Sequence, residues 1–161
     1  MTVRLCRDDE RATITAIINA AAEKYRGVIP PDCFHDPYIG DTALAADIAG
    51  GIAFWGCEDA GALVGVMGIQ TVKHQPLIRH AYVLPARQGK GIGSRLLSFL
   101  LGRQAEPVLV GTWAAATWAI RFYERHGFVM TRRDETERLL KTYWNVPPRQ
   151  IETSVVLRHQ P

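Results

Sequence analysis

A glycine-rich turn between an apolar run and a leucine-rich stretch constrains this sequence more than any other feature. The apolar run is Leu77–Leu84, the turn lies within Pro85–Ser94, and leucines recur after it at positions 96, 97, 100 and 101. This order predicts a strand, a tight turn and a helix. Glycine lets successive backbone N–H groups point outward at the positive end of a helix, where phosphate oxygens bind. The sequence therefore predicts an anion-binding turn.

The spacing of the glycines excludes the two commonest phosphate-binding loops. A P-loop needs four residues between its first glycine and a Gly-Lys-Ser/Thr ending, and the chain has no such string. The dinucleotide fingerprint needs G-x-G-x-x-G, whereas Gly89, Gly91 and Gly93 simply alternate. The pattern that is present, Gln88-x-x-Gly91-x-Gly93, resembles the acyl-CoA pyrophosphate loop of the GNAT superfamily of N-acyltransferases.

The resemblance implies a binding site for acetyl-CoA and no metal ion. Backbone N–H groups would hold the pyrophosphate, and the pantetheine arm would pair with the strand end, in a slot where the strands separate beyond Val83. Pro85 lacks an N–H and would end strand pairing there. Arg87 and Lys90 would add Coulomb attraction, or they are solvated loop charges. The implied cofactor-binding residues are Tyr82, Val83, Leu84, Arg87, Gln88, Gly89, Lys90, Gly91, Ile92, Gly93 and Ser94.

A second motif lies at Ala119–Phe128 and resembles the second GNAT signature, in which a helix carries Ala and a Tyr four residues later, and ends in Gly-Phe. The resemblance implies that Tyr123 protonates the departing CoA thiolate; the alternative is an aromatic side chain that packs the helix against the sheet. Many family members have Asn where this chain has Ala116. One side-chain contact to the cofactor is therefore missing, and Trp113 or Trp118 would supply apolar contact instead.

Direct attack of an amine on a thioester needs a base, an oxyanion donor and an acid for sulfur. A backbone N–H near Val83 is the expected oxyanion donor. His80 is the candidate base, because imidazole titrates in the useful range. Strand alternation puts Arg79 and His80 on opposite faces, although a β-bulge would swap them, and a structural histidine is the alternative. Lesser candidates for the base are Glu58, His35 and His74, or water.

The acceptor pocket of GNAT proteins is often built from the segment between the first two helices, here Tyr25–Tyr38. Its groups suit a small amphipathic amine, or they pack an ordered loop. Arg26 or Arg79 could bind a substrate carboxylate in a bidentate manner. The candidate substrate-binding residues are Tyr25, Arg26, Phe34, His35, Tyr38 and Arg79. The resemblance implies acetyl transfer to a small-molecule amine; the alternatives are a protein or peptide N-acetyltransferase and a CoA-binding sensor without turnover.

The apolar patterns around the two motifs predict the order β-α-α-β-β-β-α-β-α-β-(α)-β in one domain, residues 1–161. Antiparallel strands first and a β-α-β-α-β unit afterwards indicate a mixed α/β fold, with a largely antiparallel sheet of about seven strands and helices on both faces. This is the GNAT fold that the resemblance implies. The strands are expected at 2–7, 52–57, 62–72, 77–84, 107–113, 128–132 and 151–157.

Composition gives at most weak evidence for a nucleic-acid or membrane partner. The net charge of +3 is dispersed, so neither nucleic acid nor an anionic membrane is expected. The charged first residues differ from a signal peptide and no apolar run approaches the ~20 residues of a membrane span, so the expected location is cytoplasmic. The three cysteines lack C-x-x-C spacing and are expected as small hydrophobes. The apolar segment Val155–Leu157 would suit a homodimer interface.

Overall fold

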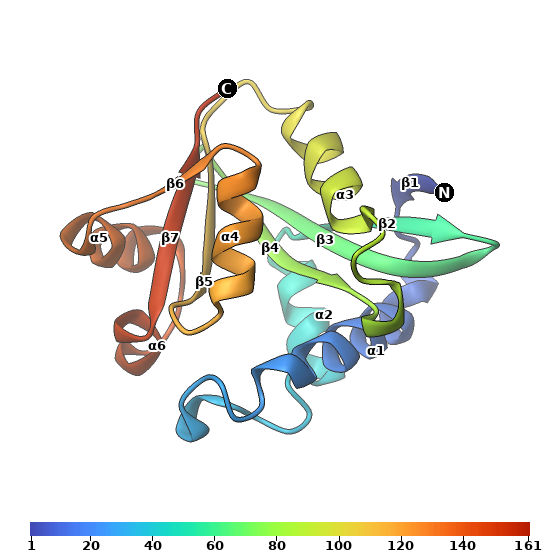
Figure 1. The fold of residues 1–161 in the computed structure, drawn as a ribbon, viewed down its shortest axis with the longest axis horizontal. Helices are drawn as coiled ribbons and strands as arrows, with labels where there is room; N and C mark the ends of the chain where they lie inside the picture. Colours follow the sequence, from blue (N-terminus) through green and yellow to red (C-terminus); the bar gives the residue numbers. More distant parts are fainter.

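Seven strands form one mixed sheet in the computed structural model, which describes residues 1–161 (Figure 1). The strands are β1 (Thr2–Leu5), β2 (Ala53–Asp59), β3 (Ala62–Val72), β4 (Gln75–Val83), β5 (Val108–Trp113), β6 (Phe128–Met130) and β7 (Ser154–His159). Their order across the sheet is β1-β2-β3-β4-β5-β7-β6, and only β4 and β5 run parallel. The mixed, largely antiparallel sheet expected from the sequence is confirmed.

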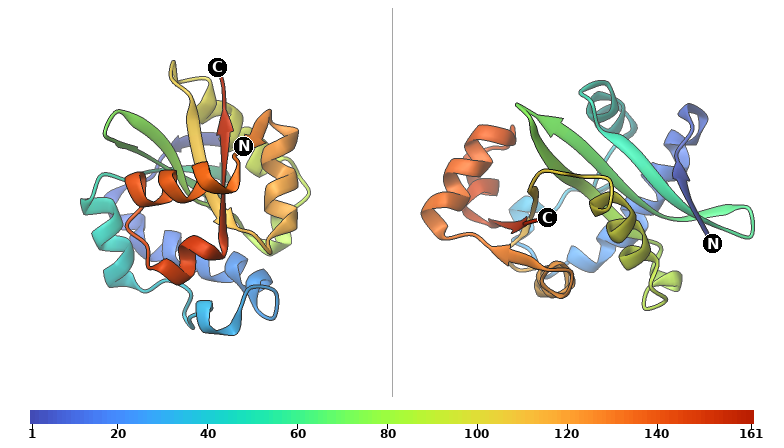
Figure 2. Two further views of the ribbon diagram at one scale, coloured as in Figure 1. Left: turned by 90° about the vertical axis from the view of Figure 1, so that its left-hand side faces the viewer. Right: turned by 90° about the horizontal axis from the view of Figure 1, so that it is seen from above.

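Helices cover both faces of this sheet, as Figure 2 shows from two sides. They are α1 (Arg11–Ala22), α2 (Asp41–Ala49), α3 (Ile92–Leu101), α4 (Thr117–Arg125), α5 (Arg133–Tyr143) and α6 (Pro148–Glu152). The helix expected after the glycine turn lies where the leucine pattern puts it. None of the helices combines the length and the apolarity that crossing a membrane requires.

The core divides along the sheet because strand residues alternate between its faces. On one face, side chains of α3 and α4 such as Leu96 join Met67 and Ile78 in the largest buried cluster. On the other face, α1 and α2 cover β2 and β3. Along β4 and β5, Leu77 and Leu109 alternate with residues of the first cluster, so their side chains lie on the second face. There they pack under α5. The α1–α2 layer and α5 thus flank the region where β4 meets β5.

The last strand lies in the interior of the sheet, between β5 and β6. Val156 and Leu157 are fully buried by the chain's own helices, and the backbone of β7 is paired on both sides. The prediction that this segment offers a dimer interface is therefore wrong. The sequence also missed α6: Pro148 occupies the first helical turn, where a proline loses no hydrogen bond, so Ile151 is helical and the strand begins later.

The parallel strands β4 and β5 separate early. They pair at Leu77 with Leu109 and at Ile78 with Val110, and not beyond. The slot between them therefore opens after Ile78, earlier than the point beyond Val83 that the sequence predicts. Parallel strands that diverge leave backbone groups of β4 unpaired on the side that faces β5.

A β-bulge lies at the point where β4 leaves β5. Tyr82 pairs with Val66 and Arg79 pairs with Gly68, so two residues of β4 oppose the single residue between them on β3. His80 in the bulge has φ 55°, a left-handed conformation that is uncommon for residues other than glycine. The extra residue bends the strand and redirects its side chains. The strict alternation that would put Arg79 and His80 on opposite faces is therefore broken at this point.

Candidate active site

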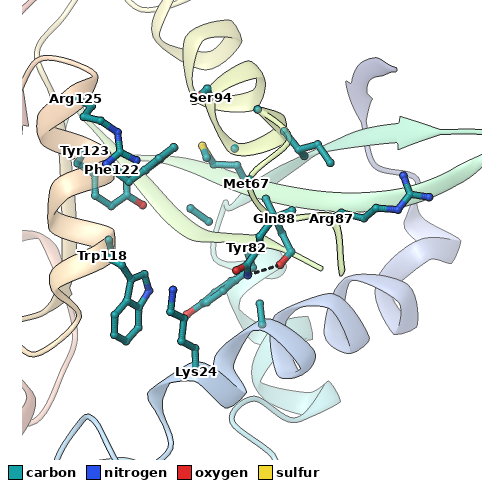
Figure 3. Close-up of a pocket in the computed structure, with 18 of the residues that line it drawn as sticks. Lys24, Met67, Tyr82, Arg87, Gln88, Ser94, Trp118, Phe122, Tyr123 and Arg125 are labelled. Atoms are coloured by element: carbon teal, nitrogen blue, oxygen red, sulfur yellow. Dashed lines mark hydrogen bonds between the residues drawn. The ribbon is translucent and has the colours of Figure 1, made fainter. Parts of the chain in front are cut away.

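A first cavity of about 280 Å³ lies beside the end of β4, between the glycine turn and α4 (Figure 3). β4 and the start of α3 form one wall, and α4 forms the opposite wall. Lys24 and Tyr25, which follow α1, reach the cavity from a third side. Residues far apart in the sequence thus enclose one space.

The glycine turn presents a row of free hydrogen-bond donors to this cavity. No backbone N–H from Gly89 to Ser94 has an acceptor within the chain, and the first bond of the α3 ladder is from the N–H of Arg95 to Gly91, at 3.0 Å. Gly89 and Gly91 have φ 76° and 78°, and a Cβ added to either would meet nothing within 4 Å. The donors therefore face open space at the positive end of a helix, which is the arrangement that binds a pyrophosphate.

At the end of β4, one residue turns its backbone groups toward the slot. The N–H of Leu84 donates to the carbonyl of Val64 at 2.9 Å, which fixes the alternation of the antiparallel ladder with β3. Val83, one residue earlier, then directs its N–H and C=O away from β3 and into the slot. Its carbonyl accepts the side-chain amide of Gln88 at 3.1 Å, drawn as a dashed line in Figure 3. This bond ties the glycine turn to the strand.

Tyr123 on α4 directs its hydroxyl into the first cavity (Figure 3). The side chain is 5% exposed and its ring packs edge-on against Phe122 and Phe128. The hydroxyl makes no hydrogen bond within the chain. Every fully buried side-chain oxygen of the structure has a hydrogen-bond partner, so this hydroxyl is not fully buried and borders the cavity. Burial, with a smaller contribution from Tyr25, raises the pKa of Tyr123 well above the usual value. The phenol is therefore protonated at neutral pH and free to donate.

A second cavity of about 130 Å³ lies on the other side of the slot, between β4, β5 and the segment that joins α5 to β7. Tyr25 and Tyr82 line both cavities, so their rings form the wall between them. Their hydroxyls are 3.4 Å apart. Tyr38 extends the aromatic wall, and its hydroxyl accepts the indole N–H of Trp113 at 2.8 Å.

His80 lines the second cavity and forms a pair with Asp47 of α2. Its Nε2 lies 2.8 Å from Oδ2 of Asp47, and its ring stacks on Phe54. Burial opposes the ionisation of Asp47, but the hydrogen bond and charge of His80, with a smaller contribution from Arg79, hold the pKa of that carboxyl below its usual value. In a neutral imidazole that donates its Nε2–H to Asp47, the lone pair lies on Nδ1. The pair is built like a base and its orienting carboxylate.

A comparison with known protein families identifies the family of this chain. A family model described as "Acetyltransferase (GNAT) domain" matches residues 50–130, which are half of the chain. The chain belongs to the GNAT acetyltransferase family. A comparison of the sequence with curated proteins found no match.

Solved GNAT structures share the whole fold. A GNAT acetyltransferase from Staphylococcus aureus superposes over 99% of this chain and 98% of its own, with 14% identity and a TM-score of 0.73. The PaiA N-acetyltransferase of Thermoplasma acidophilum, solved with coenzyme A, covers 100% of both chains (13% identity, TM-score 0.71). The putative acetyltransferase YncA of Salmonella typhimurium, solved with acetyl-CoA, covers 99% of this chain and 93% of its own (21% identity, TM-score 0.68).

Most residues that the GNAT resemblance implied for the cofactor come together in the first cavity. Leu84 does not line it, and its N–H is used by β3; Lys90 is exposed outside it. Arg87 lines it while forming an ion pair with Asp59 at 2.5 Å. The implied residues that do line the cavity are Tyr82, Val83, Arg87, Gln88, Gly89, Gly91, Ile92, Gly93 and Ser94.

Sequence reasoning missed two cations of the first cavity, Lys24 and Arg125. Lys24 lies over the ring of Trp118, 4.5 Å from its centroid. The basic helix end that holds Arg125 was visible in the sequence, but nothing there placed it at a cavity. Of the two tryptophans named from the sequence, Trp118 lines this cavity and Trp113 lines the other.

The acceptor-side candidates divide into two groups. Tyr25, Tyr38 and Arg79 line the second cavity. The others line neither cavity: Arg26 pairs with Glu23 and Asp36 and stacks on Phe34, and His35 is exposed.

The lesser candidates for a base lie elsewhere. Glu58 is ion-paired with Arg4 at 2.6 Å, and His74 is exposed in the turn between β3 and β4. Neither they nor His35 line a cavity next to the slot, which leaves His80 as the imidazole at the site.

Proposed function

We propose that this GNAT acetyltransferase transfers the acetyl group of acetyl-CoA to the primary amine of a small molecule, by direct attack of the amine on the thioester. The observation that carries the proposal is the pair of cavities that meet at the wall of Tyr25 and Tyr82. One cavity offers free backbone donors for a pyrophosphate and a buried phenol, and the other offers an imidazole–carboxylate pair. A donor and an acceptor can therefore approach one point from opposite sides.

The residues of the first cavity suit coenzyme A. The free N–H groups of Gly89–Ser94 match pyrophosphate oxygens, and Arg125 and Lys24 add positive charge. The unpaired edge of β4 suits the amide groups of the pantetheine arm, which would add to the sheet as an extra strand does. Met67 and Trp118 supply apolar contact along the same space.

Each step of the transfer has a residue in reach of the slot. The amine nitrogen attacks the acetyl carbonyl, and His80, oriented by Asp47, takes the proton that the nitrogen loses. The N–H of Val83 points into the slot and stabilises the oxyanion. As the C–N bond forms and the C–S bond breaks, Tyr123 gives its proton to the sulfur, and water returns a proton to the phenolate.

The second cavity supports a small acceptor over a protein substrate. Trp144, Val146 and Gln150 close it from the segment between α5 and β7. The ring of Trp144 lies 3.3 Å from where a Cβ on Gly111 would be, so this segment packs tightly on β5. A protein N-terminus would need an open groove at that place. The complete set of acid, oxyanion donor and base candidates argues against a sensor without turnover.

An amine panel tests this proposal. The purified protein is mixed with acetyl-CoA and small primary amines, and the released thiol is followed with a thiol-reactive chromophore, while calorimetry measures acetyl-CoA binding. We expect amine-dependent thiol release by a subset of the panel. Binding of acetyl-CoA with no amine raising release above hydrolysis would favour the sensor, and acetylation of peptides alone would favour a protein substrate.

The base has its own test within the same assay. His80→Gln is expected to lower kcat by about 10²–10⁴. Asp47→Asn is expected to lower it less, because the imidazole remains but loses its orienting carboxylate. His74→Gln is the matched control, since that side chain lies outside the site. Wild-type kcat in His80→Gln from pH 6 to 9 would leave water as the acceptor of the amine proton.

A further inference from the structure

Arg79 is a half-buried cation without an acidic partner. Its Nη1 donates to Oε1 of Gln70 at 2.8 Å, while Asp47, the nearby carboxylate, is bonded to His80. Burial lowers the pKa of Arg79, and the charge of Asp47 only partly offsets this. A guanidinium stays charged at neutral pH and carries five N–H donors. A single neutral partner leaves most of these donors for something else, and burying a charge is unfavourable unless it is paired.

The β-bulge brings Arg79 and His80 to the same face of the sheet. His80 contacts Asp47 and Phe54 on the face that α2 covers. Arg79 is paired with Gly68, where an added Cβ would meet the side chain of Phe54 on that same face. Residues directly opposite in an antiparallel pair project to one face. The guanidinium of Arg79 and the imidazole of His80 therefore lie beside the same space.

That space is the second cavity, and its other walls are uncharged. Among its lining residues Arg79 is the only lysine or arginine, and there is no aspartate or glutamate. Trp113 and Trp144 supply flat apolar walls. At about 130 Å³ the cavity is smaller than the ~300–1,000 Å³ that drug-sized ligands occupy, so it suits a compact molecule.

We propose that the acceptor is a compact amino acid: its carboxylate binds the guanidinium of Arg79, and its amine lies toward His80 and the slot. This inference rests on the proposed acetyl transfer and names the substrate class. A planar carboxylate matches the fork of a guanidinium in a bidentate manner. Because Arg79 and His80 line the same small cavity, an acceptor that reaches both must carry its amine and its carboxylate within one compact molecule, as an amino acid does.

The test compares amino acids with their own carboxamides, which differ in charge and little in shape. We expect the wild type to have a kcat/KM for an acid about 10–100-fold above that for its amide, from one lost charged hydrogen-bond pair. The amine of an amino acid carboxamide is less basic than the amine of the amino acid itself, so more of it is unprotonated and able to attack. Amine protonation would therefore favour the carboxamide and cannot produce a preference for the acid. In Arg79→Gln the acid and the amide should become equal, through KM more than through kcat. Arg79→Lys should be intermediate.

Arg26→Gln is the matched control, because Arg26 is exposed, paired and outside the cavity. It should keep the wild-type preference, and both variants should bind acetyl-CoA like the wild type. Equal turnover of acids and amides by the wild type, an unchanged preference in Arg79→Gln, or a preference for aminophosphonates over carboxylates would overturn the inference.

Calorimetry separates this inference from the proposed function. Amino acids are titrated into the protein saturated with CoA, which needs no turnover. Binding that weakens at least about 10-fold in Arg79→Gln supports the inference even if thiol release is never seen. Thiol release with uncharged amines, but no binding of any amino acid, overturns it and leaves acetyl transfer standing.

Discussion

Tyr123→Phe is the substitution that separates the chemistry of the first cavity from its folding. The hydroxyl of Tyr123 makes no hydrogen bond within the chain, so removing it breaks no intramolecular bond. The ring keeps its edge-on contacts with Phe122 and Phe128 in a site that is 5% exposed. The free energy of unfolding should therefore change by less than about 1 kcal/mol. The affinity for acetyl-CoA should stay near the wild-type value.

The rate of acetyl transfer should fall sharply. Loss of a positioned general acid costs about 10²–10⁴ in rate, equivalent to about 2.7–5.5 kcal/mol of barrier at 1.36 kcal/mol per tenfold. A thiol has an ordinary pKa near ~8.5, so the departing thiolate accepts a proton readily once the C–S bond lengthens. Because burial raises the pKa of Tyr123, the wild-type acid stays protonated across the working pH range.

The assay is single-turnover acetyl transfer with enzyme in excess, since product release can mask a change in the chemical step. It should be run from pH 6 to 9 with thermal unfolding and acetyl-CoA titration beside it. Tyr143→Phe, the same substitution on α5 away from both cavities, is the control. A single-turnover rate within threefold of wild type across this pH range would refute the assignment of Tyr123 as the acid.

Three further predictions concern the turn, the core and an ion pair. Gly91→Glu should abolish acetyl-CoA binding by calorimetry, because it puts a carboxylate and a strained φ among the free N–H donors; Gly27→Glu, also at positive φ but outside the cavities, should not. Leu96→Ala, which truncates a fully buried side chain on the inner face of α3, should cost about 2–5 kcal/mol in denaturant unfolding, and a loss under about 1 kcal/mol would contradict the packing described. Glu10→Gln should destabilise the fold by about 1.5–3 kcal/mol at pH 7. Hydrogen bonds from Arg4 lower the pKa of Glu10 to about 2, below its unfolded value, so this difference should shrink as pH falls from 4.5 toward 2, and a difference that persists at pH 2 would count against the pair.

The fold and the glycine turn could be predicted from the sequence because the patterns that indicate them are local. The alternation of Gly89, Gly91 and Gly93 and the leucines of α3 lie within one continuous stretch, and propensity and packing agree there. The resemblance placed Tyr123 at a helix that tertiary structure brings to the same cavity. The position of that hydroxyl follows from the fold as a whole and not from its neighbours in sequence.

The acceptor side could not be predicted in the same way because it depends on contacts between distant segments. Nothing local in the sequence shows that β4 carries a bulge, so the shared face of Arg79 and His80 appears only once β3 and β4 are paired. The pairing of His80 with Asp47 joins residues 33 positions apart. Trp144 reaches β5 because Gly111 leaves room for its ring, and neither residue alone predicts this contact.

The position of β7 between β5 and β6 has a consequence for how a chain leaving the ribosome acquires its two cavities. The strands that flank β7 are synthesised before it, so each lacks that neighbour until residues 154–159 have emerged. The first cavity is built entirely from residues 21–125 and contains no residue of β7. The second needs Trp144, Gln150 and Ser154. During vectorial synthesis all residues of the first cavity therefore leave the ribosome before the residues that complete the second cavity.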